Sequence, residues 1–314
     1  MINKQRQDAY LNLIQSLLNC PSGEESQILK AHPDLIDQEL LQAIAQVIEV
    51  FKENGEQNAV DILRYQAHQL TGVMGLSALD LTSNQDDDAR FALLMQVLQA
   101  TADGDSQTLY QLLQENLDKL DDKFVAVLRE WAESTLSDTK KGLEIASVVG
   151  NFSSFTSQFP LSNRSINQEL ALVGYEALSQ VFTRDVLPDY WAMNQGNLGN
   201  AYYYRIEGDR SENLERAIQY YEAALEVYTR QDFPQKWSSI QSNVGEAYRN
   251  RLKGEKEKAS NLELAIRCGQ SALELRTPGD FPEQWAATQN NLGLAYWERI
   301  WGEKAENLEI AIAC

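Results

Sequence analysis

The sequence repeats itself between about residues 187 and 314. Three tryptophans, Trp191, Trp237 and Trp285, are spaced 46 and 48 residues apart, and each begins the same series of residues. The series is Asn-Leu-Gly or Asn-Val-Gly, then Tyr, Arg and Gly, then Asn-Leu-Glu and finally Ala-Ile. A constant period of about 20–50 residues is typical of repeat proteins, in which each unit buries its apolar face by stacking on its neighbours. The repeat therefore favours a stacked array over a single globular core.

Each repeat is predicted to form two antiparallel helices. Proline stands at the start of the first helix in every copy, at Pro188, Pro234 and Pro282, where its missing N–H costs nothing. Apolar residues then follow at helical spacing, from Leu198 to Tyr202 and again from Leu214 to Tyr228.

Other residues are predicted to mark where these helices begin and end. Gly208 is expected to stop the first helix, as a C-terminal glycine does. Ser165 with Gln168, and Ser260 with Glu263, have the spacing of a capping box at the start of a second helix. The small residues at which large neighbours are expected to approach closely are Gly199, Ala217 and Ala224.

The repeat resembles the tetratricopeptide repeat. That family has a Leu-Gly-x-x-Tyr core on its first helix, and an Ala, an aromatic residue and another Ala on its second helix. The matching residues here are Leu198, Gly199, Tyr202, Ala217, Tyr221 and Ala224. The period exceeds the family standard of about 34 residues, and such long repeats look like bacterial arrays that often accompany a caspase-like CHAT protease domain. Over about residues 165–314 the resemblance implies an all-α fold, a right-handed α-solenoid of antiparallel helix pairs.

The chain is expected to contain three segments. The apolar pattern of a first helical unit recurs in a second one at offsets of 81 and 84 residues, with a polar linker from Leu81 to Asp88 between them. Residues 167–188 match residues 213–234, so a partial repeat precedes the fuller ones, and its first helix is expected over Thr139–Phe155. The predicted boundaries are 1–80 and 86–160 for the helical units and 165–314 for the array, divided into a partial repeat 165–188, repeats 189–234 and 235–282, and an incomplete repeat 283–314.

The composition excludes several classes of function. A net charge of −19 argues against nucleic acid and against an anionic membrane surface, because both require a basic face. No apolar run is long enough to span a bilayer, and the N-terminus lacks a signal-peptide pattern. Three cysteines without a paired framework indicate a cytoplasmic protein. Because no histidine has metal-ligand neighbours and no acid, base and nucleophile converge, no catalytic residue, metal or cofactor is expected.

The best candidate site lies on the first helices of the repeats. Asn197, Asn243 and Asn291 each precede the core Leu or Val, on a flank that faces the concave groove in the family that the repeat resembles. An amide both donates and accepts, so a row of amides suits a peptide backbone. The alternative is that these asparagines link neighbouring helices of the array. Asn200 and Tyr204 continue the same face.

Two further sets of residues accompany this row. Three arginines, Arg205, Arg251 and Arg299, fall in the last turn of the first helices. A cation there interacts favourably with the helix dipole, and the alternative is a purely structural role. Trp297 and Trp301 replace residues that vary among polar types in the other repeats, so both are expected to be exposed and to form a contact surface. The candidate groove residues are Asn197, Asn200, Tyr204, Asn243, Asn291 and Trp297.

These features predict a non-catalytic scaffold or adaptor that binds a protein or peptide in a concave groove. The alternative is the N-terminal sensing or regulatory arm of a larger effector such as a CHAT protease. A reading frame that continues into a His/Cys protease domain would decide for this alternative. The last repeat stops inside its second helix, so its first helix is expected to leave an apolar stripe uncovered. A homodimer through this open repeat is therefore expected as a further partner.

Overall fold

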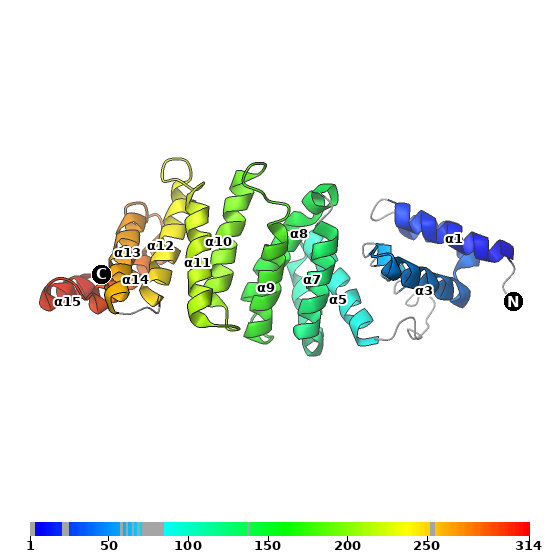
Figure 1. Ribbon diagram of the computed structural model, residues 1–314, viewed down its shortest axis with the longest axis horizontal. Coiled ribbons are helices and arrows are strands. Elements are labelled where there is room, and N and C mark those ends of the chain that lie inside the picture. The colour runs from blue at the N-terminus through cyan, green and yellow to red at the C-terminus, as the bar shows by residue number, and fades with distance from the viewer. Residues whose placement is uncertain are drawn as a thin grey trace. The chain divides into compact units, whose positions relative to one another are not determined.

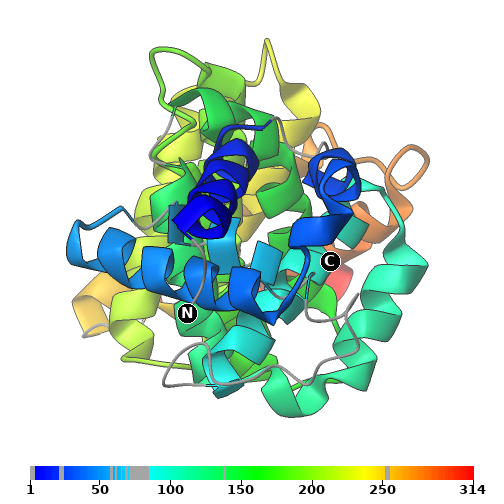
Figure 2. The same ribbon diagram turned by 90° about the vertical axis from the view of Figure 1, so that its right-hand side faces the viewer.

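The computed structural model describes residues 4–20, 25–56, 59–60, 62–64, 66–67, 70, 85–136, 139–251 and 255–314. In these residues the chain forms helices joined by turns, and it contains no strand. Contacts divide the chain into two units, Met1–Phe152 and Ser153–Cys314. Figures 1 and 2 show the helices of both units from two directions. The predicted all-α class is confirmed.

The first unit contains two series of helices in the same order. The first series is α1 (Lys4–Asn19), α2 (Glu25–Ala31), the 3₁₀ helix η1 (Pro33–Leu35) and α3 (Gln38–Glu53). The second series is α5 (Gln85–Ala102), α6 (Ser106–Glu115), the 3₁₀ helix η2 (Leu117–Lys119) and α7 (Asp122–Leu136), after which α8 (Thr139–Gln158) begins. Each series places a short helix and a 3₁₀ turn between two long helices, which is the order that an internal duplication produces.

The same ion pair occurs in both series. Arg6 donates to Asp37 at 2.7 Å and Arg90 donates to Asp121 at 2.6 Å, and both pairs are 31 residues apart in sequence. Each aspartate also accepts the backbone N–H three positions further on, so it caps the long helix that follows. Arg6 and Arg90 are 84 residues apart, and so are Asp37 and Asp121, so α1 aligns with α5 and α3 with α7 at the same offset. The sequence predicted an offset of 84 for α3 and α7, but 81 for α1 and α5.

Part of the predicted linker between the series is helical. Residues 85–88 belong to the first turn of α5, because an acidic residue interacts favourably with a helix N-terminus and does not prevent the helix from starting there. Leu81–Asn84 and residues 71–80 of the predicted first unit lie outside the described residues.

The second unit is a stack of helix pairs. Its helices, after the end of α8, are α9 (Arg164–Leu178), α10 (Pro188–Tyr204), α11 (Arg210–Leu225), α12 (Pro234–Asn250), α13 (Glu255–Leu273), α14 (Pro282–Glu298) and α15 (Lys304–Ala313). From α9 onward, each helix packs against the next one in the sequence, as Figure 1 shows. Pro188, Pro234 and Pro282 occupy the first turn of α10, α12 and α14, as predicted. The packing is that of a solenoid-like fold.

The core of a helix pair consists of the residues that the repeat pattern selected. Leu198 and Tyr202 of α10 are buried, as are Ala217 and Tyr221 of α11. A Cβ atom on Gly199 would lie 2.5 Å from the ring of Tyr221, so only glycine lets the two helices approach this closely. The predicted close approach at Gly199 is confirmed.

The predicted end of the first helix is wrong. α10 ends at Tyr204, and Arg205 takes an extended conformation with φ −58° and ψ 129°. Gly208 lies beyond this point in the loop, with φ +81°. Its role is to turn the loop back toward α11, in a left-handed conformation that glycine adopts without a steric penalty.

The predicted caps of the second helices are also wrong. α9 begins at Arg164, and its cap is Asn163, whose side chain accepts the Ser165 N–H. α13 begins at Glu255, so Ser260 lies inside the helix, because the residues before it have good helix propensity and extend the helix toward its start. The expected helix over Thr139–Phe155 is present as α8, which continues to Gln158.

Candidate functional site

A row of two-point ion pairs links each repeat to the preceding one. Arg205 Nε lies 2.7 Å from Glu169 Oε1, and Arg205 Nη2 lies 2.9 Å from Glu169 Oε2. Parallel contacts of this kind are stronger and more directional than a single charged hydrogen bond. The pairs, each 36 residues apart, are Arg205–Glu169, Arg251–Glu215 and Arg299–Glu263. These contacts support the structural role for the three arginines.

Tyrosines of the same first helices make a second row of contacts. The Tyr202 hydroxyl donates to Glu176 Oε1 at 2.7 Å. Burial, together with this hydrogen bond, raises the pKa of Tyr202 to about 12, so the hydroxyl remains a donor at neutral pH. The pairs, each 26 residues apart, are Tyr202–Glu176, Tyr248–Glu222 and Tyr296–Gln270.

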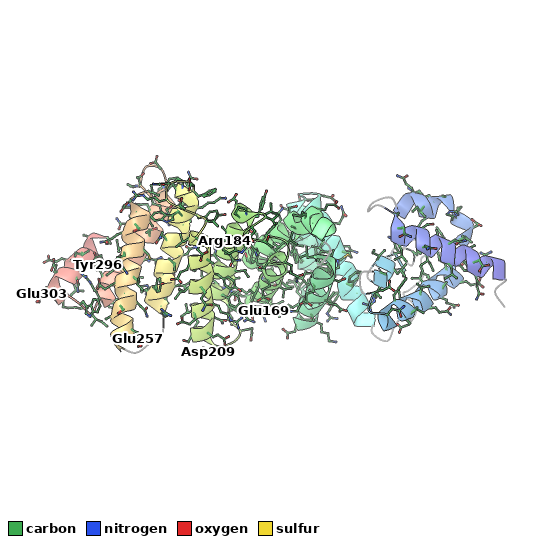
Figure 3. All side chains as sticks on the ribbon, turned by 45° about the horizontal axis from the view of Figure 1, so that its top comes forward. Glu169, Arg184, Asp209, Glu257, Tyr296 and Glu303 are labelled. Atoms are coloured by element: carbon green, nitrogen blue, oxygen red, sulfur yellow. The ribbon has the colours of Figure 1, made fainter. Side chains whose placement is uncertain are left out.

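The repeated tryptophans lie at the other edge of the stack. Glu169 lies near the start of α9 and Arg184 lies in the loop after its end, and Figure 3 labels both residues on the array. Arg184 pairs with Glu226, and its guanidinium lies 5.5 Å from the centre of the Trp191 ring. The corresponding contacts one repeat later are Arg230–Glu274 and Arg230–Trp237. The tryptophans that open the repeats therefore pack against the loops between repeats.

The asparagine row makes contacts between neighbouring first helices. Asn243 Nδ2 donates to Asn200 Oδ1 at 2.9 Å, and the same oxygen accepts from Tyr221 Oη at 2.8 Å. Asn291 Nδ2 lies 3.4 Å from an oxygen of Glu246, which occupies in α12 the position of Asn200 in α10. These amides thus join one repeat to the next, as the alternative interpretation of the row expected.

Exposed large side chains gather on one face of α10. Tyr190, Met193 and Tyr204 are 52%, 42% and 52% exposed. Their spacing, with Asn197 between them, places all four on one side of the helix. We call Tyr190, Met193, Asn197 and Tyr204 the groove stripe, after the groove that the family resemblance implies at the first helices. Tyr190 and Met193 were not among the predicted site residues, although their spacing from Asn197 is visible in the sequence.

The last helix pair carries a second apolar surface. Trp297 and Trp301 are 57% and 50% exposed, as their positions in the repeat predicted. A groove of about 420 Å³ lies between α14 and α15, and Trp297 is one of the side chains that line it. Its lining has no charged side chain and consists of Trp285, Ala286, Gln289, Asn290, Gly293, Leu294, Trp297, Leu308, Ala311, Ile312 and Cys314.

Metal-ligating side chains do not cluster in the described part of the chain. No three His, Cys, Asp or Glu side chains among the described residues are placed to hold a metal ion. Burial raises the pKa of the Cys268 thiol to about 11, which makes it a poor nucleophile at neutral pH. None of the described helices is long and apolar enough to cross a membrane.

No protein-family model matches this sequence, and no curated protein matches it. The observed packing of helices in neighbouring pairs is compatible with a helical repeat protein. The candidate site therefore consists of two surfaces that the structure itself indicates. They are the groove stripe on α10 and the apolar face of α14 and α15.

Proposed function

We propose that the protein is a non-catalytic scaffold whose repeat array resembles tetratricopeptide repeats and binds a peptide or protein segment along the first helices. The groove stripe on α10 carries this proposal. Three large side chains are exposed on one side of this helix, and exposed apolar side chains that share a face mark interaction sites. Tyrosine supplies contact area and a hydrogen-bonding group with little loss of conformational entropy, so Tyr190 and Tyr204 suit such a surface.

The proposed occupant is an extended segment with apolar side chains. The amides of Asn243 and Asn291 are engaged between repeats, so Asn197 is the member of the asparagine row within the groove stripe. Apolar side chains of the segment would pack on Tyr190, Met193 and Tyr204. Aromatic residues that anchor a segment in this way contribute most of the binding free energy in many interfaces.

The test uses a random decapeptide library with acetylated and amidated ends, selected on the wild-type protein. Dissociation constants of the selected peptides are then measured by fluorescence anisotropy. Tyr204→Ser is expected to weaken binding about 10-fold, because it removes an aromatic anchor. Leu161→Ser, which changes an exposed residue outside the stripe, is expected to bind as the wild type does. Failure to select any peptide, or equal binding by Tyr204→Ser, would refute the proposal.

The apolar face of α14 and α15 supports a second proposal, which is pairing with another copy of this chain. A protein with a net charge of −19 repels its own copies, so they associate best through a surface without charge. The groove between α14 and α15, which Trp297 lines, has no charged side chain in its lining. Trp297 and Trp301 would both lose solvent exposure in such a pair, which favours association.

A further inference from the structure

One position in the repeats changes from an aromatic residue to an arginine. Phe182 and Tyr228 stand in the loops that follow α9 and α11, and both are buried. Arg276 stands at the same place after α13 and is only 8% exposed. The alignment is secure because Thr229 bonds Asp232 in one loop as Thr277 bonds Asp280 in the next. The chain therefore buries a cation where its other repeats bury a ring.

The residues around Arg276 have changed together with it. Arg276 Nη2 donates to Ser239 Oγ at 3.0 Å, and Nη1 donates to Thr288 Oγ1 at 2.7 Å. One repeat earlier, the counterparts of these two hydroxyl residues are Met193 and Ile240. The polar residues around Arg276 thus stand at positions where the preceding repeat has apolar residues.

A second polar residue, Ser242, joins this group of polar side chains. Ile240 lies against Gly196, whose hypothetical Cβ would be 2.9 Å from Ile240 Cδ1. Ser242 and Thr288 are the counterparts of Gly196 and Ile240 one repeat later. Their hydroxyls lie 3.2 Å apart, and both residues are buried. Ser239, Ser242, Thr288 and Arg276 therefore form one continuous polar cluster.

The charge of Arg276 has no counterion in this cluster. Its contacts go to two hydroxyls and, at 3.4 Å, to the Gln284 carbonyl oxygen, and no described carboxylate bonds to it. Burial lowers the pKa of the Arg276 guanidinium, but an arginine remains protonated at neutral pH. A guanidinium has five N–H donors, so donors remain available beyond these three contacts. A buried charge without a counterion is costly, and an anion would relieve that cost.

Arg276 reaches the side of α12 that corresponds to the groove stripe. Ser239, which accepts from Arg276, occupies in α12 the position that Met193 occupies in α10. Ser239 is partly exposed, so the guanidinium lies directly below a surface that a bound segment can reach.

We infer that Arg276 forms a subsite for the carboxylate of an acidic residue in the segment bound along the first helices. The Ser239 and Thr288 hydroxyls donate to backbone carbonyl oxygens and accept from Arg276, so they hold the guanidinium in place and leave its remaining N–H groups for the carboxylate. The inference rests on the proposed function. One positive charge matches one carboxylate, whereas a phosphate would bring excess negative charge to a protein of net charge −19. A carboxylate also fits the planar fork of an arginine in a two-point contact.

The first test compares peptide pairs. Each selected decapeptide is synthesised with Glu and with Gln at its acidic position, and both are titrated. The wild type is expected to prefer the Glu peptide about 10-fold, since hydrogen bonds between charged groups are the stronger ones. Arg276→Met is expected to lose this preference and still bind the Gln peptide, whereas Arg230→Gln keeps it. A preference that is absent in the wild type, or that persists in Arg276→Met, would overturn the inference.

The second test uses acetate and does not depend on peptide binding. The midpoint of thermal unfolding is compared in sodium acetate and in sodium chloride of equal ionic strength at pH 7. Acetate is expected to raise the wild-type midpoint above that in chloride. Ser239→Met, which installs the side chain present at this position in α10, keeps the arginine but covers it, and should abolish the difference, as should Arg276→Met.

The two tests separate failure of the subsite from failure of the scaffold function. If acetate raises the unfolding midpoint only when Arg276 and Ser239 are both present, and no peptide is selected, the carboxylate subsite is supported and the scaffold function is refuted. Equal acetate and chloride midpoints in the wild type, or equal acetate effects in all variants, would overturn the subsite. If Arg276→Met does not fold, Ser239→Met decides the outcome.

Discussion

Individual side chains connect the repeats through partners at constant separations in the sequence. Arg205 and Glu169 are partly shielded from solvent, with 25% and 13% of their side chains exposed, and they meet through two hydrogen bonds. Exposed ion pairs contribute little to stability because water and salt screen them. Partial burial and two-point geometry make these inter-repeat pairs more specific, so they select the correct neighbour of each helix.

Asn243→Ala tests the role of the asparagine row. The change removes the donor to Asn200 and is expected to lower the free energy of unfolding by about 1 kcal/mol, as loss of a partly buried hydrogen bond does. Urea denaturation measures this difference. Asn197 belongs to both the asparagine row and the groove stripe. The free energy of unfolding of Asn197→Ala is expected to stay within about 0.5 kcal/mol of the wild-type value. If Asn243→Ala left stability intact and weakened peptide binding, the asparagine would be a groove residue.

Asp121→Asn tests the ion pair of the first unit. Asparagine can still cap α7, so the change removes mainly the charge that faces Arg90. Hydrogen bonds from Arg90 lower the pKa of Asp121, so the carboxylate contributes stability above its ordinary pKa. That contribution disappears as the pH falls through the lowered pKa. The variant should therefore be less stable than the wild type at pH 7 and nearly equal to it below about pH 3. A difference that is independent of pH would contradict this account.

Helices α10 and α11 meet closely because one of them lacks a side chain at their contact. Gly199→Ala would place a Cβ atom 2.5 Å from the Tyr221 ring, which is fully buried and has no room to move away. Overpacking of this kind is expected to cost about 1–3 kcal/mol. Differential scanning calorimetry measures the loss.

Gly279→Ala is the matched control for this helix contact. Gly279 lies in the loop before α14, where a Cβ atom would meet only the Thr277 hydroxyl at 3.9 Å. Its replacement is expected to leave stability unchanged or slightly increased, because alanine restricts the unfolded chain. Equal losses in both variants would show that the cost at Gly199 does not come from the Tyr221 contact.

At the scale of the whole molecule, association through α14 and α15 gives a direct prediction. Trp301 is half exposed in the turn between α14 and α15, so Trp301→Glu adds a charge to the proposed pairing surface and should abolish dimer formation. Analytical ultracentrifugation over a range of concentrations measures the dissociation constant. Val186→Glu adds the same charge at another exposed apolar residue and should dimerise as the wild type does. A wild-type protein that remains monomeric at every concentration would refute the pairing.

The repeat pattern predicted much of the fold because helical faces leave a regular record in the sequence. The buried positions of Leu198, Tyr202 and Tyr221 follow from comparing repeats. Trp297 is exposed as expected, although its counterpart Tyr203 is buried, so its exposure depends on its place in the last helix pair. The ends of helices were less predictable. Ser260 has a capping pattern inside α13, since local spacing does not reveal that the preceding residues are also helical.

The sequence by itself determined the all-α class, the helix pairs and most of their buried residues, because periodicity along one chain decides which side of each helix is apolar. The tertiary structure decided which polar groups meet. Asn243 finds Asn200, and Arg276 lies between Ser239 and Thr288, through contacts that join different repeats. Such contacts depend on how one helix pair is rotated and shifted against the next, and that geometry results from packing across the interface and not from any local pattern of residues.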